Sequence, residues 1–165
     1  RAAGRDLSSL YAGYYVAELL ADGTQDYDPH PELFDAALAT LRKLEKGTAL
    51  ETVLSFELVW LRELGYSPRL DACSVCGSEA IAPGTARVYF SPQAGRVLCP
   101  NCGPAAPDRR MLSLPALQVL QGMTEQRSGL SVSAVRGELR GLFSQLVSFV
   151  LGRRPKLLSY LEENR

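Results

Sequence analysis

Hydrophobic residues recur at helical spacing in the first patterned stretch of the chain, residues 6–21. Its stripe consists of Leu7, Tyr11 and Tyr14, with Tyr15 and Leu19 beside them. Asp6 is a candidate N-cap, and Gly23 follows just past the stretch. Closely spaced tyrosines can form a platform for stacked bases, but at helical spacing they more often belong to a core. The pattern therefore predicts an amphipathic helix whose tyrosines pack inside.

Two further stretches, 31–46 and 49–64, also have helical spacing. The apolar stripe of the first consists of Leu33, Phe34, Ala37, Leu41 and Leu44. The second begins with a capping box, in which Glu51 follows Thr48 at the required offset. Glu57 falls on the apolar side of this helix, where an unpaired carboxylate would be costly. We expect Glu57 to be paired, most simply with an arginine.

The middle of the chain predicts a β-hairpin. The short runs RVYF and RVL have strand character, and the turn sequence SPQAG joins them within residues 87–98. After Cys102 the sequence GPAAPDRR is typical of a linker.

Three helices are expected in the C-terminal part. The first covers about 115–122, the second begins after Ser131 or Ser133 and ends at about 151, and the third covers 155–164. Ser113 is the candidate cap of the first, and Ser131 or Ser133 that of the second. The long second helix has a regular packing seam of Val135, Leu139, Leu142, Leu146 and Phe149.

All four cysteines fall in two C-x2-C pairs, Cys73 with Cys76 and Cys99 with Cys102, separated by 22 residues. Two residues between cysteines allow both thiolates to reach one ion from a tight turn. Gly77 and Gly103 follow the pairs, and we expect them to supply the backbone freedom of each turn. Two such knuckles joined by a hairpin predict a closed, tetrahedral four-cysteine site, which suits one structural zinc ion.

Other interpretations of the cysteines are two disulfides, a redox pair, or iron in a rubredoxin-like site. Disulfides fit poorly with a chain that shows no export signal, and a redox C-x-x-C normally stands alone. Iron is the strongest alternative to zinc. The segment between the outer cysteines is too small to bury a core, so a metal is expected to hold it together.

The fold class predicted from these elements is mainly α: a helical bundle with an inserted four-cysteine zinc-ribbon hairpin. We expect three regions: a first helical part at 1–70, a zinc finger at 71–104, and a C-terminal helical part at 105–165.

Composition and charge narrow the function. The 165 residues include one histidine, and the sequence has no Walker-type phosphate loop, so we expect no enzyme. Residues 1–82 carry 7 Lys and Arg against 13 Asp and Glu, whereas residues 83–165 carry 11 against 5. This asymmetry indicates either an anionic partner for the C-terminal half or simple attraction between the halves. No segment predicts a membrane span or a signal peptide, and we expect a cytoplasmic protein. Because the chain begins with Arg1, we also expect it to be part of a longer one.

Several stretches together resemble the bacterial RecO family of recombinational DNA repair proteins. In chain order they are YYVAELL, HPELFDAALATLRKL, LSFELVWLRELGYSPRLDACSVCG, YFSPQAGRVLCPNC and LVSFVLGRRPKLLSYL. The third and fourth are the most specific, because they join helix, loop, hairpin and knuckles in one order. The C-terminal KLLSYLEE is more acidic than is usual in the family.

The resemblance implies that this chain is the helical and zinc-finger part of such a protein. Family members begin with an OB-fold domain of roughly eighty residues, which is absent from this sequence. OB-folds commonly bind single-stranded nucleic acid. The resemblance further implies a recombination mediator, bound to chromosomal DNA in the nucleoid, that binds single- and double-stranded DNA and anneals strands. By resemblance it loads RecA indirectly, acts with RecR, and binds the acidic, phenylalanine-ended C-terminal tail of the single-stranded DNA-binding protein.

An anionic ligand of either kind needs cations. The candidates are Arg109, Arg110, Arg136, Arg140, Arg153, Arg154 and Lys156. Arg136 and Arg140 are one helical turn apart and are expected on one face. The alternative function is a zinc-stabilised helical scaffold or protein-interaction module without direct DNA contact.

Overall fold

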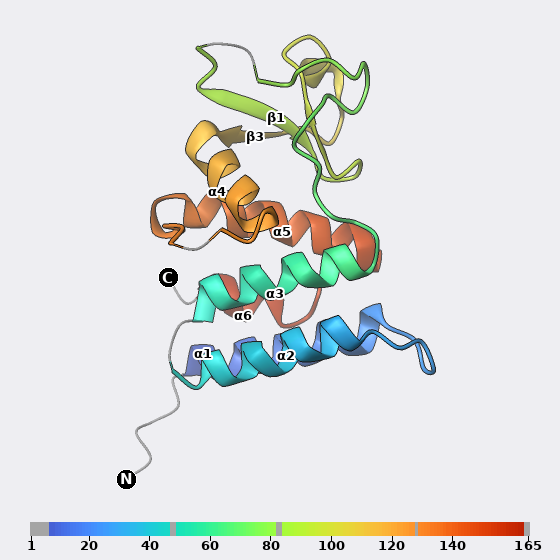
Figure 1. The fold of residues 1–165 in the computed structure, drawn as a ribbon, viewed down its shortest axis with the longest axis vertical. Coiled ribbons are helices and arrows are strands. Elements are labelled where there is room, and N and C mark those ends of the chain that lie inside the picture. The colour runs from blue at the N-terminus through green and yellow to red at the C-terminus, as the bar shows by residue number, and fades with distance from the viewer. Residues whose placement is uncertain (1–6, 47–48, 82–83, 128, 164–165) are drawn as a thin grey trace. The chain divides into compact units, whose positions relative to one another are not determined.

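The computed structural model describes residues 7–46, 49–81, 84–127 and 129–163, and it divides into two compact units. The helical unit comprises Arg1–Tyr66 with Val150–Arg165, and the finger unit comprises Ser67–Phe149. The described residues form mainly helices and one three-stranded antiparallel sheet (Figure 1). The predicted fold class, helices with a four-cysteine hairpin module, is therefore confirmed. The predicted region boundaries at 70 and 104 stay a prediction.

The helical unit contains α1 (Leu7–Gly23), α2 (Pro31–Leu44), α3 (Ala49–Glu63) and α6 (Leu158–Glu163). Its largest fully buried side chains are Trp60, Tyr15, Phe56, Leu19, Leu33, Leu54 and Leu61. The Trp60 indole N–H donates to the carbonyl of Leu19 at 2.9 Å. A Cβ at Gly23 would overlap that indole, so the end of α1 needs a residue without a side chain.

Glu57 is fully buried within this unit, as its place on the apolar side of α3 predicted. The hydroxyl of Tyr15 donates to its Oε1 at 2.5 Å. Glu57 was expected to be paired with an arginine; the partner found here is the hydroxyl of Tyr15, which the sequence did not indicate, and pairing with an arginine stays a prediction. This hydrogen bond gives both the buried tyrosine hydroxyl and the buried carboxyl group a polar partner.

The helical stripes were predicted too broadly. In α1 Tyr15 is buried, but Leu7 and Tyr14 are exposed; in α2 Phe34 and Leu41 are exposed. The buried arc of α2 instead consists of Leu33, Ala37, Thr40 and Leu44. Both helices are apolar on more than one side, so spacing alone did not identify the side that packs. The predicted caps Asp6 and Thr48 lie outside the described residues.

The finger unit contains a sheet of strand order β2-β1-β3, built from β1 (Arg87–Ser91), β2 (Arg96–Leu98) and β3 (Arg110–Ser113). The predicted hairpin is confirmed, with Phe90 opposite Val97. β3 was not predicted, because its residues were assigned to a linker and the start of the next helix. It pairs with β1, placing Leu112 opposite Val88.

The outer edge of β2 is also covered. The N–H of Arg69 donates to the Gly95 carbonyl at 2.8 Å, and the N–H of Val97 donates to the Arg69 carbonyl at 3.2 Å. Further along, the N–H of Ser74 donates to the Val97 carbonyl at 3.0 Å. The segment 69–74 thus runs beside β2 immediately before it forms the first cysteine turn.

Two helices complete the finger unit: α4 (Leu114–Thr124) and α5 (Arg136–Leu151), whose last two residues belong to the helical unit. A short 3-10 helix, η1 (Gly103–Ala105), follows the last cysteine, and another, η2 (Ser133–Val135), leads into α5. The Ser113 cap is confirmed, since its hydroxyl accepts the N–H of Ala116. The serine cap of the long helix is wrong: Val132 occupies the N-cap position of η2 without a side-chain bond.

The seam predicted along α5 is buried at Val135, Leu139, Leu142 and Leu146, but Phe149 is 46% exposed. α5 ends at Leu151, as predicted, and Gly152 follows it in the left-handed region at φ +68°. The last helix was expected to begin at Pro155, but α6 begins at Leu158. The Glu18 carboxylate holds this connection, accepting the N–H groups of Lys156 at 2.7 Å and Leu157 at 3.0 Å.

None of the helices in the described part of the chain has both the length and the apolar character needed to cross a bilayer.

Candidate metal centre

Each cysteine pair sits on a tight turn closed by a backbone hydrogen bond. In the first turn the N–H of Gly77 donates to the Cys73 carbonyl at 3.0 Å. In the second the N–H of Gly103 donates to the Cys99 carbonyl at 2.9 Å. The two turns are therefore equivalent in hydrogen bonding, as the repeated sequence predicted.

The two glycines serve different purposes, which corrects the prediction for Gly103. Gly77 has φ +74°, a conformation that costs other residues roughly 1–2 kcal/mol. Gly103 is not in that region; a Cβ there would overlap the ring of Tyr89. Close packing against Tyr89, and not backbone freedom, therefore explains the second glycine.

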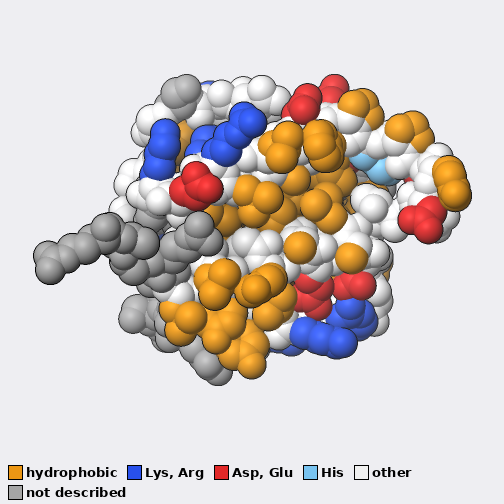
Figure 2. Space-filling view, turned by 90° about the horizontal axis from the view of Figure 1, so that it is seen from below, with side chains coloured by type: hydrophobic (Ala, Val, Ile, Leu, Met, Phe, Trp, Pro, Cys, Tyr) orange, Lys and Arg blue, Asp and Glu red, His pale blue; other side chains and the backbone are white. Residues whose placement is uncertain are grey.

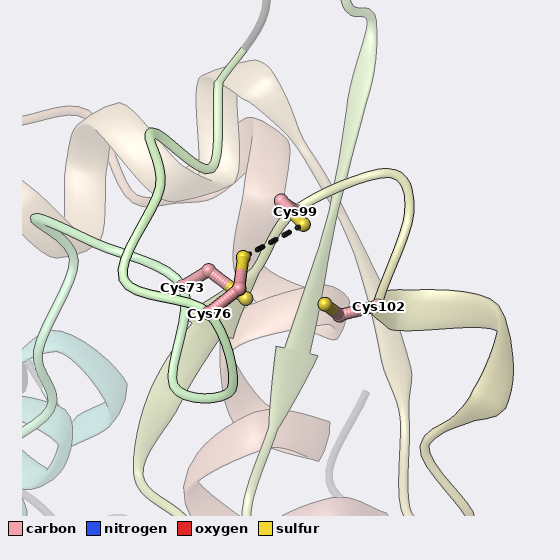
Figure 3. Close-up of side chains that lie close together, drawn as sticks. All are labelled: Cys73, Cys76, Cys99 and Cys102. Atoms are coloured by element: carbon pink, nitrogen blue, oxygen red, sulfur yellow. Dashed lines mark hydrogen bonds between the residues drawn. The ribbon is translucent and has the colours of Figure 1, made fainter.

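The four cysteine side chains converge between the two turns (Figure 3). All four sulfurs lie within 4.8 Å of one another, and Cys76 Sγ lies 3.7 Å from Cys99 Sγ. Sulfurs that share one tetrahedral ion at about 2.3 Å lie about 3.8 Å apart. None of the four forms a disulfide. The arrangement fits a metal ion held by four thiolates.

Burial differs around the centre. Cys73 and Cys99 are buried together with Leu98, and Tyr89 and Ala106 pack against them. Cys102 is partly buried, and Cys76 is exposed, with its Sγ 3.0 Å from the Ser78 hydroxyl. The centre is therefore closed on one side by the sheet and open to solvent at Cys76.

The thiols do not ionise independently. The backbone N–H of Cys102 lowers the pKa of Cys99 to about 6, because it stabilises the thiolate. Hydrogen bonding to Cys99 raises the pKa of Cys102 to about 12. Burial raises the pKa of Cys73, but backbone N–H groups, that of Cys76 first, outweigh it and lower the pKa overall. Deprotonation of all four thiols together is therefore unfavourable, and a bound cation would stabilise the four thiolates.

A carboxylate that the sequence did not indicate supports the hairpin. Asp108 Oδ2 accepts the Ser91 hydroxyl at 2.6 Å and the N–H of Gln93 at 2.9 Å. Burial acts to raise the pKa of Asp108, but these two donors outweigh it and hold the pKa below its ordinary value. Its only signal in the sequence was an acid in the presumed linker, which is too common a feature to be interpreted.

The predicted cations fall in both units. Arg109, Arg110, Arg136 and Arg140 belong to the finger unit, and Arg153, Arg154 and Lys156 to the helical unit. Arg136 is exposed, whereas Arg140 is only 7% exposed, so the pair does not present one open face. Arg153 forms ion pairs with Glu18, at 3.5 Å, and with Asp22.

Arg109 and Arg110 are adjacent but differ. Arg109 is exposed, and its guanidinium donates to the Ala106 carbonyl at 3.1 Å. Arg110 is partly buried against Gly141, where a Cβ would overlap its guanidinium. Burial lowers the pKa of Arg110, and the nearby Glu138 opposes that shift. Arg110 is thus part of the packing between β3 and α5.

Comparison with known proteins gives one consistent family. The family model for the C-terminal part of recombination protein O matches residues 4–159. A DNA repair protein RecO of Rhodopirellula baltica is 30% identical over 191 residues, covering 99% of this chain and 70% of the relative. Proteins of the same name from an Anaeromyxobacter species and from Myxococcus xanthus are 36% and 33% identical. The match covers 96% and 98% of this chain, but 63% and 65% of those relatives. The chain thus spans somewhat under two thirds of the length of these last two.

Proposed function

Because this chain belongs to the RecO family, through the C-terminal part of its members, we propose that it is the zinc-binding helical module of a DNA repair and recombination mediator. The module acts by binding and not by catalysis. In the cell it works in the cytoplasm on chromosomal DNA, with RecR and the single-stranded DNA-binding protein, and it assists RecA indirectly. The observation that supports this most directly is the family match, which covers nearly the whole chain.

Zinc is the proposed ion, with Cys73, Cys76, Cys99 and Cys102 as its ligands. Four thiolates with no open position favour a structural role, in which the ion links the two turns and does no chemistry. Elemental analysis should give one zinc per chain, and X-ray absorption should give four sulfurs at about 2.3 Å. An intense visible absorption with one iron per chain would instead establish a rubredoxin-like site.

The proposed anion-binding residues are the exposed cations, which fall into two pairs for testing. Arg109 and Arg136 represent the finger unit, and Arg154 and Lys156 the helical unit. Arg110 and Arg140 are less available because they are partly or wholly buried, and Arg153 is engaged by two carboxylates. The ligand is DNA, or an acidic peptide that ends in phenylalanine.

Charge reversal of each pair separates these possibilities. Binding of single-stranded DNA, double-stranded DNA and the peptide is measured by fluorescence anisotropy at several salt concentrations. We expect reversal of the responsible pair to weaken binding about tenfold or more, and to lower the salt slope by about one per lost phosphate contact. Reversal of Arg42 and Lys43, two exposed cations of α2, is the matched control and should have little effect.

A second candidate function is a scaffold that holds other parts of the protein without touching DNA. It is favoured by the structural use of Arg110 and Arg153, two of the seven candidate cations. If neither pair affects DNA or peptide binding while metal content stays at one per chain, the scaffold function is the better description.

A further inference from the structure

The solvent-exposed side of α1 is almost free of polar residues. The exposed residues of this helix before Asp22 are Leu7, Leu10, Tyr14, Ala17 and Ala21. No charged residue occurs between Leu7 and Ala17. A surface helix normally places charged and polar residues on its outer side, and a helix that is apolar all round is normally buried. The outer side of α1 therefore has the composition of a covered surface.

A second apolar stripe, on α2, lies beside the first. Gly13 of α1 approaches Leu41 of α2, since a Cβ on Gly13 would lie 3.6 Å from the Leu41 Cδ2. Phe34 and Leu38 continue from Leu41 at helical spacing. We define the α1–α2 apolar face as Leu7, Leu10, Tyr14, Phe34, Leu38 and Leu41. These six side chains are between 37% and 63% exposed.

Figure 2 views the side on which α1 and α2 lie, and hydrophobic side chains gather across it. Contiguous apolar surface of this kind generally marks an interaction site in a protein that must remain dissolved. Interfaces that form permanently are more apolar and poorer in charge than those of transient partners. The lack of charge along α1 therefore favours an occupant that stays in place.

The length of the relatives offers a candidate for this occupant. The match leaves 30% to 37% of the three relatives outside it. Because the family model describes the C-terminal part of these proteins, the remainder lies mainly ahead of the matched region. Such a segment would join the described fold just before Leu7, which is itself a member of the α1–α2 apolar face.

We propose that the α1–α2 apolar face is the docking surface for the part of the longer protein that precedes these residues. The occupant presents an apolar, weakly charged surface and covers the face permanently. This inference rests on the family match and on the exposed residues, and it depends neither on whether a metal binds nor on the proposed DNA contacts.

Carbene footprinting tests the proposal by comparing the full-length gene product with the 165-residue chain. Labelling of the peptides that contain Tyr14 and Phe34 should be at least about fivefold lower in the full-length protein. The control positions Val75 and Met111, exposed in the finger unit, should label equally in both. Equal labelling of the face in both proteins would overturn the proposal. Protection that disappears on dilution, together with a dimer mass, would also overturn it and assign the face to a second copy.

A pair of variants gives a second readout. Phe34→Asp places a charge in the face, whereas Ala39→Asp places one at another exposed position of α2. Phe34→Asp should lower the melting temperature of the full-length protein by about 5 °C more than that of the 165-residue chain. Ala39→Asp should affect both proteins equally. If Phe34→Asp also affects both equally, nothing docks on the face and the proposal fails.

Discussion

The helical unit and the knuckle region, residues 73–106, are stabilised in opposite ways. The first buries large hydrocarbon and aromatic side chains such as Trp60, Phe56 and Leu54. In the second, the buried cluster at the sulfurs consists of Cys73, Leu98 and Cys99, and the hairpin adds the buried side chains of Val88, Phe90 and Val97. Burial of apolar area supports a unit only when there is enough of it, and below that size a metal takes its place.

The two regions also differ in how they accommodate negative charge. Among its described residues the helical unit buries the carboxyl group of Glu57, which accepts the hydroxyl of Tyr15. The knuckle region gathers four sulfurs within 4.8 Å, where hydrogen bonding to Cys99, together with burial and the charge of Cys73, raises the pKa of Cys102 to about 12. A single buried carboxyl group can thus accept a hydrogen bond from a neighbouring hydroxyl, whereas a cluster of thiolates requires a cation.

Removal of the metal gives the largest expected contrast between the regions. A chelator, or Cys99→Ser, should abolish amide protection across residues 73–103 while leaving α1, α2 and α3 protected, because their core contains no cysteine ligand. Structural zinc sites contribute on the order of 10 kcal/mol, enough to decide whether such a small region folds. Hydrogen exchange by mass spectrometry measures both regions at once. Retained protection of the knuckles after complete chelation would contradict a structural metal.

The reverse experiment removes hydrocarbon from the helical unit. Leu54→Ala deletes a fully buried side chain and should cost about 2–5 kcal/mol in urea unfolding, through lost transfer energy and the cavity left behind. Metal content should remain one per chain. The exposed residue Phe34 provides the control: in the 165-residue chain Phe34→Ala should change stability by less than about 1 kcal/mol. Loss of metal from Leu54→Ala would mean that the two regions fold as one.

The two knuckle glycines sharpen the comparison within the finger. Gly103→Ala and Gly77→Ala should each weaken metal binding by roughly 1–3 kcal/mol in competition with a chromogenic chelator, the first through overlap and the second through backbone strain. Tyr89→Ala should rescue Gly103→Ala in part, because it removes the overlapping ring. The same change should not rescue Gly77→Ala. Equal behaviour of the two double variants would mean that Tyr89 does not explain Gly103.

The smallest expected effect concerns Asp108, which serves the hairpin turn by hydrogen bonds alone. Asp108→Asn should cost about 1 kcal/mol at neutral pH, since a charge-assisted acceptor is replaced by a neutral one. Because the pKa of Asp108 is lowered in the folded protein, its carboxylate contributes fully to stability at pH values above the ordinary pKa of an aspartate. This contribution is lost as the pH falls through the lowered pKa. The difference from the wild type should therefore be constant between about pH 5 and 8 and should shrink below about pH 4. A difference that varies between pH 5 and 8 would contradict the assigned shift.

The sequence was most informative where structure is local. The cysteine turns, the hairpin and the Ser113 cap each depend on a few neighbouring residues, and all three were predicted. β3 was missed because its pairing with β1 joins residues that are 20 to 26 positions apart in the sequence, and only Leu112 within it is fully buried. Asp108 was missed for the same reason, since its partners lie on the far side of the second knuckle.

The helix stripes show a different limit. Phe34 and Leu41 have the spacing of core residues, yet they are exposed. Periodicity reports that a side of a helix is apolar, but it does not report what covers that side. Arg140 illustrates the converse, because a charged residue one turn from Arg136 was expected on the surface and is buried.

The segment 69–74 lies along the outer edge of β2 and then turns into the first pair of ligands. If an ion holds Cys73 and Cys76, we expect it to fix the segment in this position. Release of the ion should then free the segment and uncover unpaired N–H and C=O groups of a strand that ends in Val97 and Leu98. Exposed strand edges of this kind recruit other chains. The metal-free protein should therefore aggregate, and the proposed ion would then keep the molecule in solution as well as order the finger.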